Sequence, residues 1–349
     1  MIREFARWTV SASALLFALT MANAEWDPGE SGTMDAPLAR DFVEKLTQAV
    51  EAKALKARDQ DQYDQEKAAL YRALGDGLIS VDRKTMYEAS RRLLNTLDTD
   101  GHTILWSREQ LASFQAATSP TQAAASNVAQ SLSTGKGAVL VVRPPQTTFT
   151  DSSSTAEFAR TLLTRINEEI ERSASCALVV DLSDQKGGNA WPPLAALGAL
   201  TTTENGARWV DRDGKRTPIM VPNSYQSFVR GLGPLPSNPL TKFAGTAIGV
   251  VMRSDTASAG EMLAIILRGE PRSRLFGMPS YGATTGNVMY PLPDGATVLL
   301  TMYRYALGTD GPIRGKLLPD STSIATADPE ATVLAAAEWA SEHSAACSK

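Results

Sequence analysis

The sequence has very few of the residues that bind transition metals in proteins. It contains two histidines and two cysteines in 349 residues, and no Cys-x-x-Cys pair. These are too few soft ligands for a typical zinc site. A His-Glu-x-x-His motif is absent, as is a glycine-rich phosphate loop ending in Lys-Ser or Lys-Thr. We therefore expect neither a zinc hydrolase nor a P-loop nucleotide hydrolase, and no cofactor is implied.

An excess of positive charge is also missing. The formal net charge is −4, which argues against a general nucleic-acid binder, because such proteins normally carry a basic face. With 43% hydrophobic and 21% charged residues, the composition is typical of a globular protein. A chain of this length usually divides into two domains.

The first 24 residues have the pattern of a secretory signal peptide. A basic start precedes an uncharged, largely apolar run at 8–21, and Ala-Asn-Ala at 22–24 supplies a small-x-small cleavage site. The run is shorter than the roughly 20 residues that span a bilayer. We therefore predict cleavage after residue 24, export to the periplasm or the exterior of a bacterial cell, and no transmembrane segment in the mature chain.

Export would place the two cysteines in an oxidising compartment, where Cys176 and Cys347 could pair. Alternatively, Cys176 is a small buried hydrophobe, because it precedes an apolar run typical of a strand. The sequence leaves both possibilities open.

The N-terminal part of the mature chain is predicted to be helical. Charged stretches at 36–57 and 60–74 carry apolar residues at helical spacing, and Asp82 can cap a third helix. We assign 25–118 to a small helical domain. Residues 119–136, rich in Ser, Thr, Ala and Gln, are interpreted as a linker.

The rest of the chain, 137–349, is predicted to form an α/β domain, because apolar strand-like runs alternate with helical patterns. Residues 203–243 contain several Gly and Pro and are expected to be irregular. Strands are expected at 138–144, 177–182, 246–252 and 297–305, and helices at 155–173, 192–200, about 259–267, and from Pro329 with Asp328 as its cap.

Ser258 is a candidate nucleophile. An apolar strand ends just before it and a helix begins just after it, so its hydroxyl lies at a helix N-terminus that favours negative charge. The N–H of Ala259 could then stabilise the oxyanion formed when Ser258 attacks a carbonyl. The alternative is that Ser258 only caps the helix. The segment is not a Gly-x-Ser-x-Gly elbow, because Thr256 replaces the first Gly.

A serine nucleophile needs a base, and only two histidines are available. His343 lies on a polar face close to the C-terminus and is expected to be solvated. His102 follows an Asp-Gly turn, where it could face a cleft, although it could equally be an ordinary turn residue. A rival Ser-x-x-Lys motif at Ser133 and Lys136 lies in the predicted linker, with no helix to hold it.

Taken together, the motifs resemble the C-terminal-processing (tail-specific) serine peptidase family. Within it, the chain is similar to the exported, histidine-dependent branch related to the tricorn protease core and to the repeats of interphotoreceptor retinoid-binding protein. The resemblance covers roughly residues 85–325. Its motifs, in order, are Asp-Gly-His-Thr (100–103), Asp-Leu then Gly-Gly-Asn (181–182 and 187–189), Thr-Ala-Ser-Ala-Gly-Glu (256–261), FGMPSYGATTGN (276–287), LPDGA (292–296) and Pro-Asp (319–320).

The resemblance implies a crotonase-like α/β core behind the helical domain. It implies Ser258 as nucleophile, His102 as base, and an oxyanion site formed by Gly187 or Gly188 together with Ala259. The lysine-dependent branch is excluded, because residues 276–287 contain no lysine. The peptide-binding PDZ domain of many relatives is not expected, because the segment between His102 and residue 137 is too short.

The residue that orients the histidine is not identified by the resemblance. Where relatives of this branch often carry a Glu, this chain has Arg314. Asp310 is the nearest acidic candidate, and Asp320 is the next. Relatives also usually have Arg and Asn where this chain has Ser183 and Gln185.

The resemblance thus implies an exported serine endopeptidase acting on a protein or peptide substrate. With an unperturbed histidine as base, activity should decline below about pH 6.5. A catalytically weak or inactive protein that binds a peptide or apolar ligand on the same scaffold is the alternative. An esterase is a third possibility.

Overall fold

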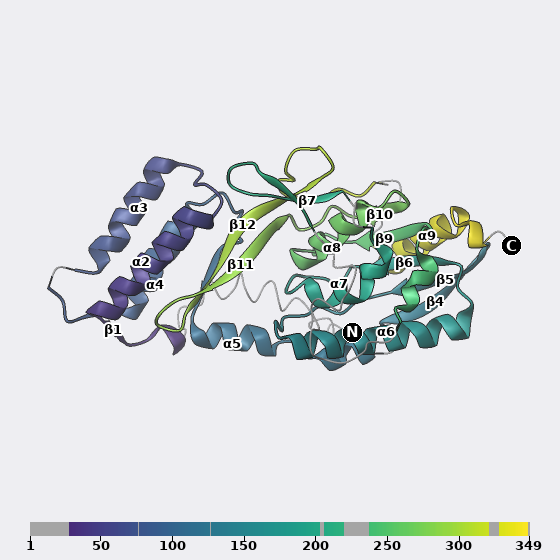
Figure 1. Cartoon of the computed structure of the whole chain (residues 1–349), viewed down its shortest axis with the longest axis horizontal. Helices are drawn as coiled ribbons and strands as arrows, with labels where there is room; N and C mark the ends of the chain where they lie inside the picture. The colour runs from purple at the N-terminus through teal and green to yellow at the C-terminus, as the bar shows by residue number, and fades with distance from the viewer. Residues whose placement is uncertain are drawn as a thin grey trace, which may run out of the picture.

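The computed structural model describes residues 28–347 except 76, 126, 203–205, 220–236 and 321–327. Along the longest axis, a helical unit lies at one end, two long antiparallel strands lie in the middle, and an α/β unit lies at the other end (Figure 1). The predicted signal peptide lies outside the described residues and stays a prediction. No described helix is long and apolar enough to cross a membrane.

Three helices form the N-terminal unit, each begun by an aspartate that accepts backbone N–H bonds. Asp35, Asp59 and Asp82 are these caps, as the sequence predicts for Asp82. Two short antiparallel strands join the unit at its base. The elements are η1 (Pro28–Glu30), β1 (Thr33–Asp35), α2 (Ala36–Lys53), α3 (Gln60–Ala73), β2 (Ser80–Asp82) and α4 (Arg83–Asn95).

The core of the helical unit also includes side chains from far along the chain. Phe42, Leu46 and Tyr87 are buried in one cluster with Val298 and other residues of β12 (Thr297–Leu307). Thus the helical unit packs directly against strands from the C-terminal half of the chain. Between the two, β3 (Ile104–Trp106) pairs with β12 and is followed by α5 (Arg108–Ala116).

The α/β unit contains a five-stranded sheet in the order β10-β9-β6-β5-β4. Its strands are parallel except β4, which pairs antiparallel with β5. The strands are β4 (Ala129–Thr134), β5 (Gly137–Val142), β6 (Ala177–Asp181), β9 (Ile248–Met252) and β10 (Ser273–Gly277). Residues 129–134 thus form an edge strand, although their composition predicts a linker, because β5 provides a ladder of hydrogen-bond partners that composition does not reveal.

Helices cover both faces of this sheet, since alternate residues of its strands are buried on opposite sides. Val139 and Val141 pack with α9 on one face, whereas Leu140 and Val142 pack with α6 and α8 on the other. The helices of this unit are η2 (Pro120–Ala124), α6 (Ser152–Ser173), α7 (Trp191–Leu197), η3 (Gly198–Leu200), η5 (Pro239–Phe243), α8 (Ala259–Arg268), α9 (Pro329–Glu342) and η6 (Ala345–Cys347). The fold class expected from the sequence, a crotonase-like α/β core with a helical N-terminal region, is confirmed.

A second sheet, in the order β11-β12-β7-β8, stands between the helical and α/β units (Figure 1). Its strand β12 contacts α2 of the helical unit and α8 of the α/β unit. Within the sheet, β3 and β7 pair with one edge of β12 and β11 pairs with the other. The remaining strands are β7 (Ala207–Val210), β8 (Arg216–Pro218) and β11 (Thr285–Pro291). The described part of 203–243 therefore contains a hairpin and a short helix, although the sequence predicts an irregular stretch.

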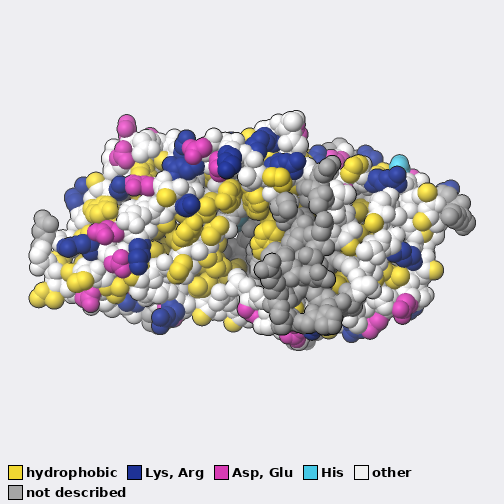
Figure 2. Space-filling model, viewed as in Figure 1, with side chains coloured by type: hydrophobic (Ala, Val, Ile, Leu, Met, Phe, Trp, Pro, Cys, Tyr) yellow, Lys and Arg dark blue, Asp and Glu magenta, His cyan; other side chains and the backbone are white. Residues whose placement is uncertain are grey.

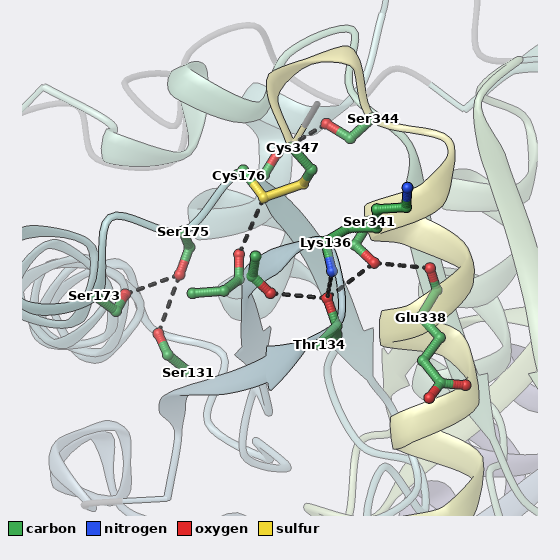
Figure 3. The surroundings of a disulfide bond; sticks show 12 residues. Ser131, Thr134, Lys136, Ser173, Ser175, Cys176, Glu338, Ser341, Ser344 and Cys347 are labelled. Carbon is green, nitrogen blue, oxygen red and sulfur yellow. Dashed lines mark hydrogen bonds between the residues drawn. A yellow bond between two sulfur atoms is a disulfide. The ribbon is translucent and has the colours of Figure 1, made fainter. Parts of the chain in front are cut away.

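Cys176 and Cys347 form a disulfide, which resolves the choice that the sequence leaves open (Figure 3). Cys176 immediately precedes β6, and Cys347 ends η6. Ser344 Oγ donates a hydrogen bond to the carbonyl oxygen of Cys176 at 2.8 Å. The bond joins the chain after α9 to the start of β6, the middle strand of the five-stranded sheet, across 171 positions of sequence.

Candidate functional site

Ser258 lies where the sequence predicts it, between the end of β9 and the start of α8. Its backbone has φ +49° and ψ −104°, a strained conformation for a residue with a side chain. The Glu261 carboxylate accepts the Ser258 N–H at 2.8 Å. Before the serine, Thr256 Oγ1 accepts the Arg253 N–H and donates to the Leu182 carbonyl. The turn is therefore held on both sides of the serine.

The start of α8 packs closely against the turn that follows β6. The Ala257 N–H donates to the Gln185 carbonyl at 2.9 Å. A Cβ at Gly260 would lie 2.5 Å from this same oxygen, so only glycine fits there. Gly187 and Gly188 in the turn both have positive φ, at +122° and +98°. The two segments that the sequence predicts for nucleophile and oxyanion site are thus neighbours.

Glu261 is fully buried and joins three parts of the site. Besides the Ser258 N–H, it accepts hydrogen bonds from the Ser280 hydroxyl and from the Gly282 N–H. Burial raises the pKa of Glu261 above its ordinary value, and these hydrogen bonds oppose that rise. Glu261 is therefore more than a residue of the first helical turn, because it fastens the loop before β11 to Ser258.

His102 follows a turn in which Asp100 and Gly101 both have positive φ, +52° and +76°. Its Nδ1 lies 2.6 Å from Thr285 Oγ1, at the start of β11. Burial lowers the pKa of His102 to about 4, an effect that the Asp100 carboxylate opposes. The ring is therefore neutral at pH 7, as a general base requires.

A buried arginine on β12 holds the loop that carries His102. Arg304 lies opposite Thr285 in the β11–β12 register, so both groups that hold this loop come from one cross-strand pair. Its guanidinium lies 3.1 Å from an Asp98 carboxylate oxygen and 3.0 Å from one of Asp100. It also donates to the Asp98 carbonyl at 2.8 Å.

A cavity of about 1260 Å³ brings the predicted residues together. Ser258, His102, Ala259 and Gly188 all line it, whereas the buried Gly187 is not in its described walls. Figure 2 shows hydrophobic side chains around the hollow in the middle of this face. The aromatic side chains among the lining residues are Trp106, Phe114, Trp191, Trp209, Tyr281, Tyr303 and Tyr305.

Asp310 is not placed to orient His102. It lies in an exposed turn just after β12, where its N–H donates to the Leu307 carbonyl. Asp320 is also elsewhere, because its carboxylate accepts the Leu275 N–H. The Nδ1 partner is instead the hydroxyl of Thr285. Thr285 lies within the motif at 276–287, but the sequence of this motif gives no signal that the threonine contacts His102.

The rival candidates lie outside the site. Ser133 and Lys136 are exposed at the β4–β5 hairpin, away from the described cavity walls. His343 is exposed, and its Nδ1 lies 2.8 Å from the Trp339 carbonyl oxygen. Within the described part of the chain, no group of three or more His, Cys, Asp or Glu side chains could hold a metal ion.

Comparison with known proteins identifies relatives of both the sequence and the fold. The model of Peptidase family S41 matches residues 146–323, just over half of the chain. The Nisin-resistance protein of Lactococcus lactis subsp. lactis is 26% identical over 166 residues, which are 48% of this chain and 50% of that protein. The chain thus spans about half the length of this curated relative.

Two solved structures share the fold over most of the chain. A lipoprotein from Streptococcus agalactiae has a TM-score of 0.69 at 18% identity, with 88% of this chain and 97% of that chain covered. The photosystem II D1 C-terminal processing protease has a TM-score of 0.55 at 16% identity, with 86% and 97% covered.

Proposed function

The chain belongs to peptidase family S41, and from this premise we propose that it is a serine endopeptidase with Ser258 as nucleophile and His102 as general base. The observation that carries the proposal is that both residues line the same cavity. They come from different units of the fold, and the histidine is neutral where a base must be.

In the first step, Ser258 Oγ attacks the scissile carbonyl carbon while His102 accepts the hydroxyl proton. Because Thr285 occupies Nδ1, the proton goes to Nε2. In the tautomer that carries its proton on Nδ1, this N–H donates to the Thr285 hydroxyl oxygen and Nε2 is unprotonated. Thr285 therefore holds the ring in the form that can accept the proton of Ser258. Asp100 favours the imidazolium that forms, since its charge raises the histidine pKa.

The negative charge of the tetrahedral intermediate needs backbone donors. We assign these to the N–H of Ala259, at the start of α8, and to the glycine turn after β6. Gly188 is favoured over Gly187 for this role, because Gly188 lines the cavity. A Cβ at Gly188 would lie 2.1 Å from the Thr147 carbonyl oxygen, so this turn tolerates only glycine.

Collapse of the intermediate returns the proton from His102 to the leaving amine and leaves an acyl group on Ser258. Water, activated by the same imidazole, then hydrolyses the ester. The aromatic walls of the cavity fit apolar side chains of a peptide. The similarity to the Nisin-resistance protein makes nisin one peptide to include in substrate trials.

Export is part of the proposal. A disulfide is typical of proteins that reside in oxidising compartments, and Cys176 pairs with Cys347. The signal-peptide pattern of the first 24 residues favours the same location.

Labelling with a fluorophosphonate tests the nucleophile. We expect the purified protein to be modified at Ser258, and expect labelling to vanish in Ser258→Ala and to fall sharply in His102→Ala. Ser133→Ala is the matched control, because this serine is exposed and outside the cavity, and it should label like the wild type. Modification of any other serine in the folded protein would contradict the assignment.

A second candidate function is ligand binding without catalysis. Among the described residues, His102 Nδ1 meets the Thr285 hydroxyl and no carboxylate. This favours the second function, because a carboxylate at this position stabilises the imidazolium in many serine hydrolases. Folded wild-type protein that resists the fluorophosphonate would support this alternative, and calorimetry with apolar peptides would then be the measurement to make.

A further inference from the structure

The segment that follows β5 runs beside the turn that carries Gly188. Strands β5 and β6 pair in parallel, so the segments that follow them leave the sheet at the same edge. At this edge, the Gln185 side chain donates a hydrogen bond to residues 144–149 at the start of the turn, and the Asn189 N–H donates to them at its end. Both ends of the glycine turn are therefore held by one neighbouring segment.

Thr147 and Asn189 are joined by two hydrogen bonds that run in opposite directions. The Asn189 N–H donates to the Thr147 carbonyl oxygen at 2.6 Å, and the Thr147 hydroxyl donates to the Asn189 carbonyl oxygen, also at 2.6 Å. Thr147 is buried and is not among the described walls of the cavity, so its hydroxyl serves this contact and not a ligand. The peptide groups before and after Asn189 are thus both held by one residue.

The side chain of Asn189 makes two further hydrogen bonds. Its Nδ2 donates to the Phe149 carbonyl oxygen at 2.8 Å, and its Oδ1 accepts the N–H of Trp191, the first residue of α7, at 3.1 Å. Asn189 therefore connects the glycine turn to the segment after β5 and to the start of α7. With four hydrogen bonds, it is a fixed point at the end of the turn.

Gly188 needs a fixed neighbour, because glycine has access to more backbone conformations than other residues. Gly187 and Gly188 both have positive φ, so the turn has two such residues in succession. The peptide group between Gly188 and Asn189 is planar, and the hydrogen bond from Asn189 to Thr147 sets the orientation of its plane. The Gly188 N–H is one rotation about φ away from this plane. An oxyanion donor is effective only when it already points to the position where the charge develops.

We propose that Thr147 is a positioning residue for the oxyanion site. Its hydroxyl, acting through Asn189, keeps the Gly188 N–H directed at the oxygen of the tetrahedral intermediate. The inference rests on the proposed peptidase function and on the assignment of the Gly188 N–H as a donor. Thr147 acts on the transition state and not on substrate binding, because the oxyanion forms only as Ser258 attacks.

The kinetics of fluorophosphonate labelling test this role without a known substrate, because the phosphonyl oxygen occupies the oxyanion site as Ser258 attacks phosphorus. Thr147→Val removes the hydroxyl and keeps the shape of the side chain. We expect the maximal labelling rate to fall about tenfold, less than the roughly 10²- to 10³-fold lost when an oxyanion donor is removed outright. The probe concentration that gives half the maximal rate should stay within about twofold of the wild type.

Three further variants separate this role from a general loss of packing. Thr147→Ser keeps the hydroxyl and should label within about threefold of the wild-type rate. Thr147→Ala lacks the hydroxyl and should lose as much as Thr147→Val, which it replaces should the latter not fold. Thr155→Val is the matched control, because Thr155 is also buried and its hydroxyl donates to a backbone carbonyl, that of Asp151 at 2.9 Å, away from the described cavity walls. It should label at the wild-type rate.

The pH profile separates an effect on the oxyanion site from one on the base. Thr147 makes no described contact with His102, so the acid limb of the labelling rate should lie at the wild-type pH in Thr147→Val. A displaced acid limb would contradict the proposal, because the loss would then act through the histidine. A change in the half-maximal probe concentration alone would contradict it as well, because Thr147 would then act on binding.

The remaining outcomes distinguish this inference from the function on which it rests. A maximal rate within about twofold of the wild type in Thr147→Val, no recovery in Thr147→Ser, or an equal loss in Thr155→Val would overturn the role of Thr147. With wild-type protein labelled at Ser258, each of these results would leave the peptidase function in place. The absence of labelling in every form, wild type included, would refute the peptidase function and with it the role of Thr147.

Discussion

Ser258 is held largely by residues close to it in the chain, whereas His102 is held by residues almost two hundred positions away. The Glu261 carboxylate that accepts the Ser258 N–H is three positions from it. The hydroxyl at His102 Nδ1 is 183 positions away, and the guanidinium that pairs with Asp100 is 204 positions away. The proposed nucleophile is thus a local feature of a strand–turn–helix, and the position of the proposed base depends on the docking of two units.

This difference predicts that the surroundings of His102 are more easily disturbed by mutation than those of Ser258. Changes in β11 and β12 should impair the base while the turn around Ser258 remains intact. Four experiments follow, from the largest expected effect on activity to the smallest.

Thr285→Val should impair the base most directly. The variant keeps the shape of the side chain but removes the partner of His102 Nδ1, so the ring loses its preferred tautomer. We expect kcat to fall by roughly 10- to 100-fold, less than the loss seen when a triad carboxylate is removed, because a hydroxyl carries no charge. Steady-state peptide hydrolysis measures it. Thr285→Ser, which keeps the hydroxyl, should recover most of the activity, and a kcat equal to that of Thr285→Val would show that the hydroxyl is irrelevant.

Arg304→Met should impair His102 indirectly, because Arg304 contacts the loop that carries the histidine and not the ring itself. The change leaves the Asp98 and Asp100 carboxylates without their buried partner, so the loop before His102 loses its main anchor. We expect activity to fall about tenfold, and stability to fall by about 1–2 kcal/mol, because the variant loses the guanidinium hydrogen bonds to this loop while the partly exposed carboxylates remain solvated. Urea unfolding and the rate of fluorophosphonate labelling measure the two effects.

The control for Arg304 is Arg314→Met. Arg314 also pairs with Asp98, at 2.7 Å, but its side chain is 64% exposed. An exposed pair contributes about 0–1 kcal/mol, so this variant should be near wild type in both measurements. If the two variants behave alike, the burial of Arg304 is not what anchors the loop.

The pH dependence of activity tests the environment of the base. Only the neutral ring accepts a proton, and burial lowers the pKa of His102 to about 4. Activity should therefore persist as the pH falls from 7 to 5 and be lost as it falls through about 4. This prediction differs from the decline below pH 6.5 expected from an unperturbed histidine. The folded state must be checked by circular dichroism at each pH, because the same shift removes stability as the pH falls from about 6.5 towards 4.

Thr285→Asp tests whether the acid limb of the pH profile reports the titration of His102. A carboxylate beside Nδ1 favours the charged ring, so the acid limb of the pH profile should move to higher pH. An acid limb that stays in place would mean that the titrating group is not His102.

The disulfide should have the smallest effect on activity. It lies at the start of β6, and neither cysteine is among the lining residues of the cavity. Cys176→Ser with Cys347→Ser should lower stability by roughly 2–5 kcal/mol, because the bond closes a long loop, while kcat stays near wild type. Thermal unfolding with and without a reductant, together with peptide hydrolysis, measures both. A large loss of kcat at a temperature where the protein is folded would contradict this.

The parts of the fold that the sequence predicts best are those with strong local signals. The cap at Asp82, the buried strands around residues 180 and 250, and the final helix after Asp328 all depend on nearby residues, and the structure contains them. Strands β4 and β11 were not predicted, because short polar segments become strands only when a partner strand supplies their hydrogen bonds.

The candidate site also contains residues that the sequence marks and residues that it does not. A strand, a small-residue turn and a helix are sufficient to mark Ser258, and two histidines in the whole chain leave little choice of base. The partners of that base could not be predicted. Thr285 and Arg304 have no sequence signal of their own, and the acidic residues near Arg314 point to Asp310 instead.

The sequence by itself determined the chemistry available to this protein: a serine at a helix start, one histidine after a turn, glycines where backbones approach closely, and no metal-binding set. The tertiary structure alone decided which groups meet. Packing of β12 against both units brings Arg304 to the histidine loop and Thr285 to its ring. The reason is physical, because local propensity acts over a few residues, whereas burial and ion pairing depend on distance in space.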